Sequence, residues 1–302
     1  MLGVIVNPNA LGVARDRGLA ERLRHLLGAE GEVVETSTSE EVASAIDRLG
    51  GCSLMASCGG DGTNLAILTE LVRRPAPLPP FALLRGGTAN TVAANLGIAG
   101  RPEQILARLL SRRRRGEPVP EVEQDLLEVN GRFGFLCAAA MGARFLEAYY
   151  RTPRPGIGWA SLLAVRTAVS SLVQGQFAQQ LFAPVPLRLS VDRQRETIRA
   201  ARLVVASVVP SVGIGMRVAY RAGTEPQRFH LVASGISTTA MALQLRRVRR
   251  GQSLSGSPHV DRLATEATAE FDRPESYTLD GELFRDTALR MRIGPRIQIV
   301  LP

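Results

Sequence analysis

The chain has 302 residues, of which 45% are hydrophobic and 22% are charged, and its formal net charge is +9. This composition is typical of a folded globular protein with room for two domains, and it excludes a disordered chain. The three cysteines and three histidines show no ligand or CxxC spacing, so a disulfide framework, a zinc site and metalloprotease or triad chemistry have no support.

Every basic residue is an arginine, which excludes a P-loop lysine, the phosphate-binding lysine of protein kinases and Schiff-base chemistry. The arginines cluster in Arg112-Arg113-Arg114-Arg115 and at 246–250. Such runs bind anionic lipid or nucleic acid, or form solvated loops. Nucleic acid is the weaker interpretation because aromatic residues are only 5% of the chain. No apolar segment reaches membrane-spanning length and the start lacks a basic leader, so we expect a cytoplasmic protein.

Strands and helices are predicted to alternate in the first third of the chain. Apolar runs at 1–6, 32–36, 54–58 and 81–84 predict strands, and helical periodicity is present at about 15–27, at 40–49 and after residue 62. Alternation at this spacing predicts a parallel sheet with helices on both faces. Because ligands bind at the carboxyl ends of such strands, the loops that follow the strands, at Asn7, Thr36, 59–63 and 85–90, are expected to converge.

The third of these loops, Gly59-Gly60-Asp61-Gly62-Thr63, separates a strand from a helix. Glycine backbone and the N-terminus of a helix are typical of a phosphate site. Asp61 would then face a metal ion or a substrate hydroxyl proton. The alternative is a tight turn in which Asp61 or Thr63 caps the helix.

A linker is predicted at 111–120, and shorter β-type segments follow it. Asn130-Gly131 between apolar strands predicts a hairpin, and further strands are predicted at 187–191, 201–209, 229–233, 267–271, 276–279, 288–293 and 297–301. Helices are predicted at 159–174 and 238–247. This pattern favours antiparallel sheets with inserted helices.

Asp280-Gly281-Glu282 places two carboxylates close together near the end of the chain. In an extended strand the two side chains would point to one side, which would suit catalysis. The alternative is a hairpin turn built on Asp-Gly.

Taken together, Asn7-Pro8, Gly59 to Thr63, Arg85-Gly86-Gly87-Thr88-Ala89-Asn90 and Leu279-Asp280-Gly281-Glu282 resemble the motifs of the diacylglycerol kinase catalytic-domain family. This superfamily also holds sphingosine, ceramide and bacterial lipid kinases and, more distantly, NAD kinases. The resemblance implies a doubly wound, Rossmann-like or NAD-kinase-like α/β domain at 1–118, with about 294–302 packing back on it. It also implies a β-sandwich domain for the lipid substrate at 119–293.

The resemblance implies ATP and Mg²⁺ as cofactors, with Asp61 as the metal ligand. Glu282 corresponds to the base that takes the proton of the substrate hydroxyl, and Asp61 and Asp280 complete the implied catalytic set. The implied nucleotide-binding residues are Asn7, Thr36, Thr38, Gly59, Gly60, Asp61, Gly62, Thr63, Asn64, Gly87, Thr88 and Asn90.

Three departures from the family pattern each remove a polar group: Ala10-Leu11 replaces Ser-Gly, Thr91 replaces an aspartate, and the segment 211–232 has Glu225 as its one acid. We expect an ATP-dependent kinase of a membrane lipid such as diacylglycerol or a sphingoid base, peripherally bound to the inner membrane surface. The alternatives are an NAD kinase and a non-catalytic nucleotide- or lipid-binding protein. No nucleic-acid partner is expected, and a homodimer is compatible with the sequence.

Overall fold

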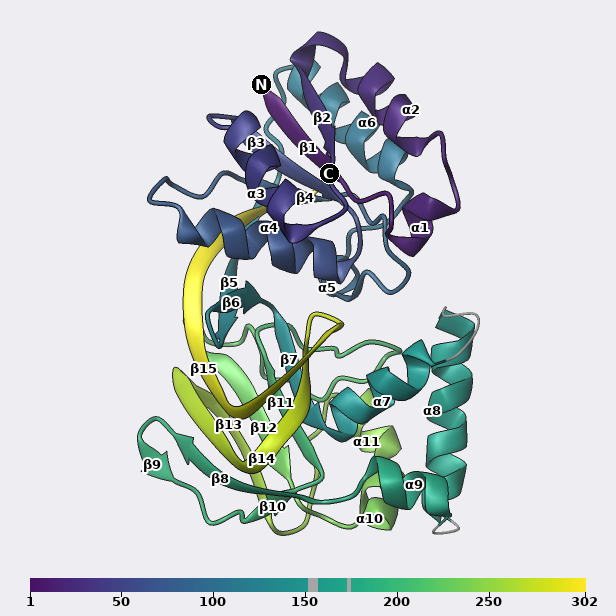
Figure 1. Ribbon diagram of the computed structural model, residues 1–302, viewed down its shortest axis with the longest axis vertical. Coiled ribbons are helices and arrows are strands. Elements are labelled where there is room, and N and C mark those ends of the chain that lie inside the picture. Colours follow the sequence, from purple (N-terminus) through teal and green to yellow (C-terminus); the bar gives the residue numbers. More distant parts are fainter. Residues whose placement is uncertain (152–156, 173–174) are drawn as a thin grey trace. The chain divides into compact units, whose positions relative to one another are not determined.

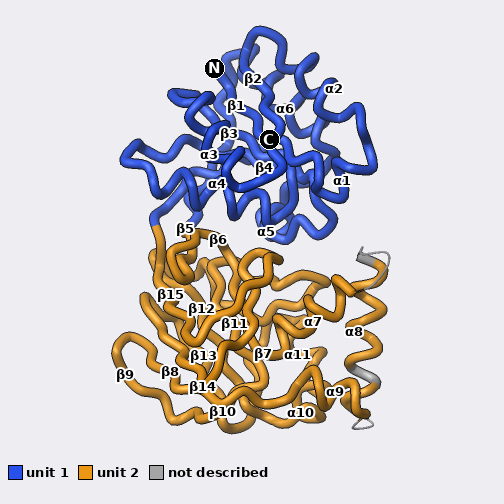
Figure 2. The backbone as a smooth tube through the Cα atoms, viewed as in Figure 1, with its two compact units in different colours: residues 1–124, 295–302 blue, residues 125–294 orange. Residues whose placement is uncertain are grey.

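The computed structural model describes residues 1–151, 157–172 and 175–302. The chain forms two compact units, one comprising 1–124 and 295–302 and the other 125–294 (Figure 2). Strands β5 (Glu121–Val129) and β15 (Glu282–Val300) run through the two boundaries, so the first unit, unit 1, is assembled from both ends of the sequence.

Unit 1 is a parallel sheet covered by helices. Its elements are β1 (Leu2–Val6), α1 (Leu11–Ala14), α2 (Leu19–Leu27), β2 (Gly31–Glu35), α3 (Ser39–Arg48), β3 (Leu54–Cys58), α4 (Asp61–Arg73), β4 (Phe81–Leu83), α5 (Thr91–Asn95) and α6 (Pro102–Arg114), with a 3-10 turn at Gly28–Glu30. The strand order is β4-β3-β1-β2, and the end of β15 extends the sheet beside β4 in the same direction.

Helices α2 and α6 pack together on one face of this sheet, and α3 and α4 pack together on the other (Figure 1). All five residues of β1 and of β3 are buried, as expected for parallel strands between two helical layers. Helix α2 turns Leu19, Leu23 and Leu27 to the core at the spacing that one helical face requires. The predicted α/β fold of this unit is confirmed.

The arginine run at 112–115 is the end of a helix. Helix α6 continues to Arg114, where Arg114 pairs with Glu30 and Arg115 with Glu117. The prediction of a linker starting at residue 111 is therefore wrong for the run itself. Arginines at the carboxyl end of a helix face the negative end of its dipole, so the run stabilises α6.

The second unit, unit 2, is antiparallel β structure with a layer of helices on one side (Figure 1). Its strands besides β5 and β15 are β6 (Arg132–Gly134), β7 (Leu136–Ala140), β8 (Val185–Val191), β9 (Gln194–Arg195), β10 (Ala200–Ala201), β11 (Leu203–Ser207), β12 (Phe229–Ser234), β13 (His259–Ala264) and β14 (Glu266–Leu279). The helices are α7 (Met141–Tyr150), α8 (Ile157–Leu172), α9 (Gln176–Leu181), α10 (Thr238–Leu243) and α11 (Leu245–Arg249). Of the predicted helix at 159–174, residues 173–174 lie outside the described residues.

Strand β14 connects two groups of strands. Its second half pairs with β7, which continues through β11 and β12 to β13, whereas its first half pairs with β8. The register of its pairing with β15 shifts between Glu270 and Glu275, as at a β-bulge. A core of strand residues such as Leu203 and Val205 packs against Leu181, Met241 and other helical residues. The predicted C-terminal β architecture is confirmed.

Three hairpins of this unit turn on two residues that both have positive φ. They are Asn130-Gly131, Asp192-Arg193 and Asp280-Gly281, which join strand residues paired directly across the turn. Positive φ at both positions is the signature of the type I′ turn. The hairpin predicted at Asn130-Gly131 is confirmed.

Arg193 is the residue least suited to its turn, because it holds φ at +65° with a side chain that is 90% exposed. We expect Arg193→Gly to raise the free energy of unfolding by about 1 kcal/mol, since glycine removes the Cβ clash of the left-handed region. Urea unfolding of both proteins would measure this change in the free energy of unfolding. Arg193→Ala is the control: it removes the exposed ion pair with Glu266 but keeps the Cβ, so an equal gain there would contradict the explanation.

Candidate functional site

Three strand-end loops of unit 1 meet through glycine backbone. A Cβ on Gly87 would lie 2.4 Å from the Cα of Gly60, and a Cβ on Gly12 would lie 2.4 Å from the carbonyl oxygen of Gly86. A Cβ on Gly86 would in turn lie 2.9 Å from the backbone nitrogen of Gly59. No other residue fits at these positions without moving the backbone. The predicted convergence of the loops after β1, β3 and β4 is thus seen directly.

Asp61 connects two of these loops. Its carboxylate accepts hydrogen bonds from the backbone N–H of Thr91 at 2.8 Å and of Val92 at 3.4 Å, and it therefore caps α5. The residue at the usual capping position, Asn90, has φ +46° and makes no side-chain cap. Burial raises the pKa of Asp61, although these hydrogen bonds and the charge of Arg85 oppose the increase. The helix-capping alternative is thus realised, but on α5 instead of α4.

Asn7 and Thr63 form a second connection. The Asn7 Nδ2 donates to the Thr63 Oγ1 at 3.0 Å, and the Asn7 backbone N–H donates to the carbonyl of Cys58. A Cβ on Gly59 would lie 2.3 Å from the Thr63 Oγ1, so glycine makes room for this hydroxyl. Thr63 and Asn64 are both buried. Gly60 is the N-cap of α4, and Asp61 and Gly62 begin that helix.

The segment at 85–90 closes on itself through Asn90. The Asn90 Oδ1 accepts from the N–H of Gly87 at 3.0 Å, and its Nδ2 donates to the carbonyl of Gly87 at 2.8 Å. Thr88, between them, is partly exposed. The turn therefore holds Gly87 against Gly60 and presents Thr88 at the surface of the loop.

The two candidate threonines after β2 differ in their surroundings. Thr38 caps α3 by accepting a hydrogen bond from the N–H of Glu41 at 3.2 Å. Thr36 is buried, and its hydroxyl has no hydrogen-bond partner in the described part of the chain. An unsatisfied buried hydroxyl is costly unless a ligand or a small movement supplies a partner, which favours Thr36 over Thr38 as a nucleotide contact.

Arg85 is a residue of this region that sequence reasoning missed. Its backbone has φ +60°, its Nη1 donates to the carbonyl of Ile98 at 3.0 Å, and its Nε is buried without a partner among the described residues. It lines a pocket of ≈ 280 Å³ together with Gly12, Gly86, Asn90 and Arg101. In a chain without lysine, an arginine directly after the fourth predicted strand was the available signal for a cation beside these loops.

In unit 2, the residues Asp280 and Glu282 have different surroundings. Asp280 is buried, and its carboxylate accepts hydrogen bonds from the N–H groups of Phe135 and Leu136 at 2.9–3.1 Å. It lies in the hairpin turn with φ +47°, so the two side chains do not extend from one side of a single strand, as was expected from the sequence. The Asp-Gly turn was the correct alternative for the backbone.

Glu282 begins β15 with an exposed side chain. The surrounding protein nevertheless removes part of the hydration of the Glu282 carboxylate, and this raises the pKa of Glu282 above the ordinary value of 4.5. The hydroxyl of Tyr150 donates to the carbonyl of Gly281 at 2.8 Å, which together with Asp280 fixes the turn that carries Glu282. The geometry therefore leaves Glu282 as the carboxylate able to meet a substrate, and the catalytic roles of both residues stay predictions.

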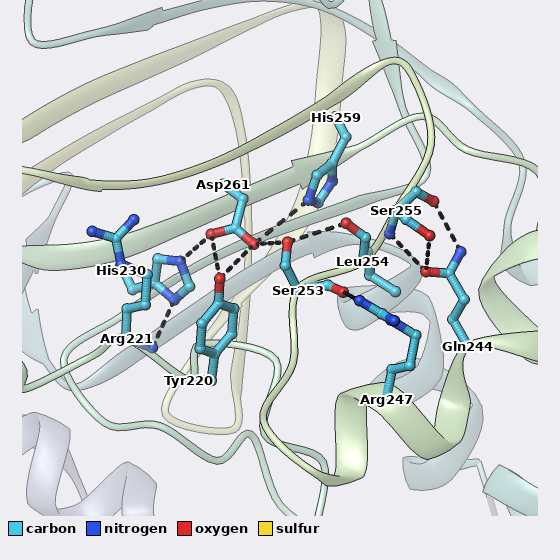
Figure 3. A network of polar contacts seen from close by, with 10 residues as sticks. All are labelled: Tyr220, Arg221, His230, Gln244, Arg247, Ser253, Leu254, Ser255, His259 and Asp261. Atoms are coloured by element: carbon cyan, nitrogen blue, oxygen red, sulfur yellow. Dashed lines mark hydrogen bonds and ion pairs between the residues drawn. The ribbon is translucent and has the colours of Figure 1, made fainter.

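A polar network in unit 2 joins Tyr220 and His230, from the segment 211–232, to Asp261 (Figure 3). Asp261 accepts from Ser253 Oγ at 2.6 Å, bonds His230 Nε2 at 2.8 Å and contacts the hydroxyl of Tyr220 at 3.3 Å. Burial disfavours the charged carboxylate, but the hydrogen bonds from His230 and Ser253, with His259 Nε2 at 3.6 Å, outweigh it and hold the pKa of Asp261 far below its usual range. Among the described residues, no three His, Cys, Asp or Glu side chains are grouped as a metal site.

The contact between Gly60 and Gly87 offers a matched pair of substitutions. Gly87→Ala places a Cβ 2.4 Å from backbone, whereas the Cβ of Gly60→Ala would meet its nearest atom at an ordinary 3.5 Å. We expect Gly87→Ala to lower the free energy of unfolding by about 2 kcal/mol or more, and Gly60→Ala by less than about 1 kcal/mol. Chemical denaturation measures both, and equal losses would contradict the backbone contact.

Because the surrounding protein desolvates the carboxylate of Asp61 and raises its pKa, the stability of the protein should depend on pH. A raised carboxyl pKa favours folding below the unfolded value, 3.8, and this contribution is lost as pH rises through the folded pKa. Relative to Asp61→Asn, the wild type should lose stability from pH 4 to pH 7. Asp61→Ala, which leaves two N–H groups of α5 without a partner, should cost about 1–2 kcal/mol across this range. A pH-independent difference between wild type and Asp61→Asn would contradict the assignment.

Comparisons with known proteins agree with these motifs. Residues 1–119 match the model of the diacylglycerol kinase catalytic domain. No curated protein matches the sequence. A diacylglycerol kinase structure from Bacillus anthracis str. Sterne has 13% identity and a TM-score of 0.66 over 100% of this chain and 96% of its own. A second, provisionally assigned one from the same organism has 14% identity and a TM-score of 0.73, covering 100% and 95%.

An NAD kinase from Archaeoglobus fulgidus, solved in complex with ATP, is more distant. It has 14% identity and a TM-score of 0.51, covering 99% of this chain and 93% of its own. At these identities the structures show the shared two-part fold and no more. The predicted resemblance is confirmed by this match over residues 1–119, which contain three of the four motifs.

Proposed function

We propose that this protein is an ATP-dependent kinase that phosphorylates a hydroxyl group of a membrane lipid such as diacylglycerol or a sphingoid base. The family match supports a phosphotransferase. The observation that carries the proposal is the contact between two loops of unit 1. The backbones of Gly60 and Gly87 touch because neither residue has a side chain, and Asp61 bonds the loop that follows β4. Such a junction at the carboxyl ends of parallel strands suits a polyphosphate.

In this proposal the N–H groups at the start of α4, the Gly59–Thr63 loop and Thr88 bind the phosphates of ATP, and Thr36 approaches the nucleotide. Arg85 supplies the positive charge that a lysine supplies in other kinases. Mg²⁺, when bound with the nucleotide, would neutralise phosphate charge. Asp61 fits as its protein ligand because each carboxylate oxygen retains a lone pair, and Mg²⁺ needs only one or two carboxylates beside phosphates and water.

Glu282 is the proposed general base. Its carboxylate takes the proton of the lipid hydroxyl as the hydroxyl oxygen bonds to the γ-phosphorus of ATP, the bond to the β–γ bridging oxygen breaks, and ADP leaves. A raised pKa suits a base that must accept a proton near neutral pH. Asp280 and Tyr150 position the turn and do not react. We also propose peripheral attachment to the inner membrane surface, where the acceptor is found.

Glu282→Gln tests the base. We expect phosphoryl transfer to fall by about 10²–10⁴-fold, measured with labelled ATP and detergent-solubilised lipids followed by mass spectrometry of the products. Because the pKa of Glu282 is raised, kcat/KM of the wild type should fall as pH drops through a midpoint above 4.5, and this acid limb should be absent from the residual activity of Glu282→Gln.

Glu270→Gln is the matched control, because Glu270 is an exposed glutamate on β14, paired with Arg188. It should keep full activity. Equal activity of wild type and Glu282→Gln would overturn the role of Glu282. NAD belongs in the acceptor panel, since the fold is shared with NAD kinases, and transfer to NAD alone would replace the lipid assignment. ATP binding without turnover on any acceptor would make the protein a non-catalytic member of its family.

A further inference from the structure

Helix α8 exposes apolar side chains along one face. Trp159, Leu162 and Val165 are 41%, 54% and 60% exposed, and their spacing of three residues keeps them on one side of the helix. We refer to these three residues as the α8 face. Large apolar side chains gathered on one exposed surface mark an interaction site more often than isolated ones do.

The opposite side of α8 is partly polar. Thr167 and Ser171 are buried, and each hydroxyl donates to the carbonyl four residues earlier, at 2.7 Å in both cases. The helix therefore satisfies buried hydroxyls with its own backbone while Trp159 and Leu162 face outward. The buried side of α8 also holds Leu163, so apolar side chains lie on both sides of this helix, unlike a helix that has a protein core on one side and only polar residues on the other.

Positive charge borders the α8 face. Arg166 follows Val165 directly, and its guanidinium lies 4.4 Å above the ring of Phe177 in α9. Helix α10, which contacts α8, carries Leu243, the large apolar side chain with the highest exposed fraction, 71%, in the described residues. After α10 comes α11 with its exposed arginines Arg246, Arg247, Arg249 and the following Arg250.

The same helices have no negative charge. The sequence has no Asp or Glu between Glu147 and Asp192, nor between Glu225 and Asp261, and α8 to α11 lie inside these two stretches. None of the arginines of α8 and α11 pairs with a carboxylate in the described part of the chain. Helices α8 to α11 thus carry exposed apolar side chains and arginines but no acidic side chain.

We propose that the α8 face enters the interfacial region of a bilayer that contains anionic lipid, while Arg246, Arg249 and Arg250 bind the headgroups. No described helix is both long and apolar enough to cross a membrane, so α8, with 16 residues, would lie in the membrane surface. A second copy is a poor occupant, because two cationic layers repel each other. Nucleic acid is also a poor occupant of the α8 face, because Trp159 is its one aromatic side chain and Leu162 and Val165 cannot stack on bases.

This inference deepens the proposed function, since a lipid kinase must reach its acceptor in a bilayer, but its test needs neither ATP nor turnover. Trp159 is the one tryptophan of the chain, so its fluorescence reports the α8 face directly. With vesicles of phosphatidylcholine and phosphatidylglycerol, we expect the emission to shift to the blue and the protein to float with the lipid. With pure phosphatidylcholine, binding should be about tenfold weaker or more.

Substitutions separate the two parts of the surface. Leu162→Ser with Val165→Ser should weaken flotation about tenfold or more and leave the Trp159 emission unshifted, whereas Leu11→Ser, at an exposed apolar residue of unit 1, should leave both unchanged. Arg246→Gln with Arg249→Gln should weaken flotation about tenfold or more, whereas Arg112→Gln with Arg113→Gln, at the same net charge, should not. Glu282→Gln should float like the wild type.

Three results would overturn the inference: wild type that does not float with anionic vesicles, flotation unchanged in the Leu162 and Val165 variant, or equal loss in both arginine pairs. If the wild type does not bind vesicles but is a dimer in sedimentation velocity, and the Leu162 and Val165 variant is a monomer, the α8 face binds a second copy instead. A kinase that is active on solubilised lipid but does not float would overturn this inference alone, and a protein that floats without kinase activity would overturn only the proposed function.

Discussion

The close approach of Gly60 and Gly87 is the constraint on which unit 1 depends. Two loops that follow neighbouring strands touch through backbone, and the carboxylate of Asp61 then bonds the first N–H groups of α5. One residue therefore joins the loop after β3 to the loop after β4. The surrounding protein desolvates the same carboxylate and raises its pKa, so the contact that orders the loops also makes the negative charge of Asp61 less stable, beside the place proposed for phosphate.

Features encoded by neighbouring residues were predictable from the sequence. Asn130-Gly131 specifies its hairpin because both residues tolerate positive φ, and the alternation of strands and helices specifies the parallel sheet. Features that depend on distant partners were not. Nothing near Asp61 in the sequence indicates that it caps a helix beginning at Thr91, and nothing near Asp280 indicates that Phe135 and Leu136 donate to it. The end of α6 was missed because arginine favours helices as readily as solvated loops.

In the hairpin at 280–282, two acids that are two residues apart have different surroundings. Asp280 is buried and saturated with backbone hydrogen bonds, whereas Glu282 is exposed and its pKa is raised. The arginines also differ in their surroundings: at the end of α6 they pair with acids, whereas those of α11 belong to a stretch, residues 226–260, that contains no acid.

Strand β15 completes the sheet of unit 1 late in synthesis. Its terminal residues Ile299 and Val300 pair with Phe81 and Ala82 of β4, yet a ribosome makes them only after all of unit 2. During synthesis the sheet of unit 1 therefore has an open apolar edge at β4 for as long as residues 125–294 are being added. Open strand edges invite pairing with other chains, so the nascent protein needs protection there, by a chaperone or by rapid folding of unit 2, before the final strand can close the sheet.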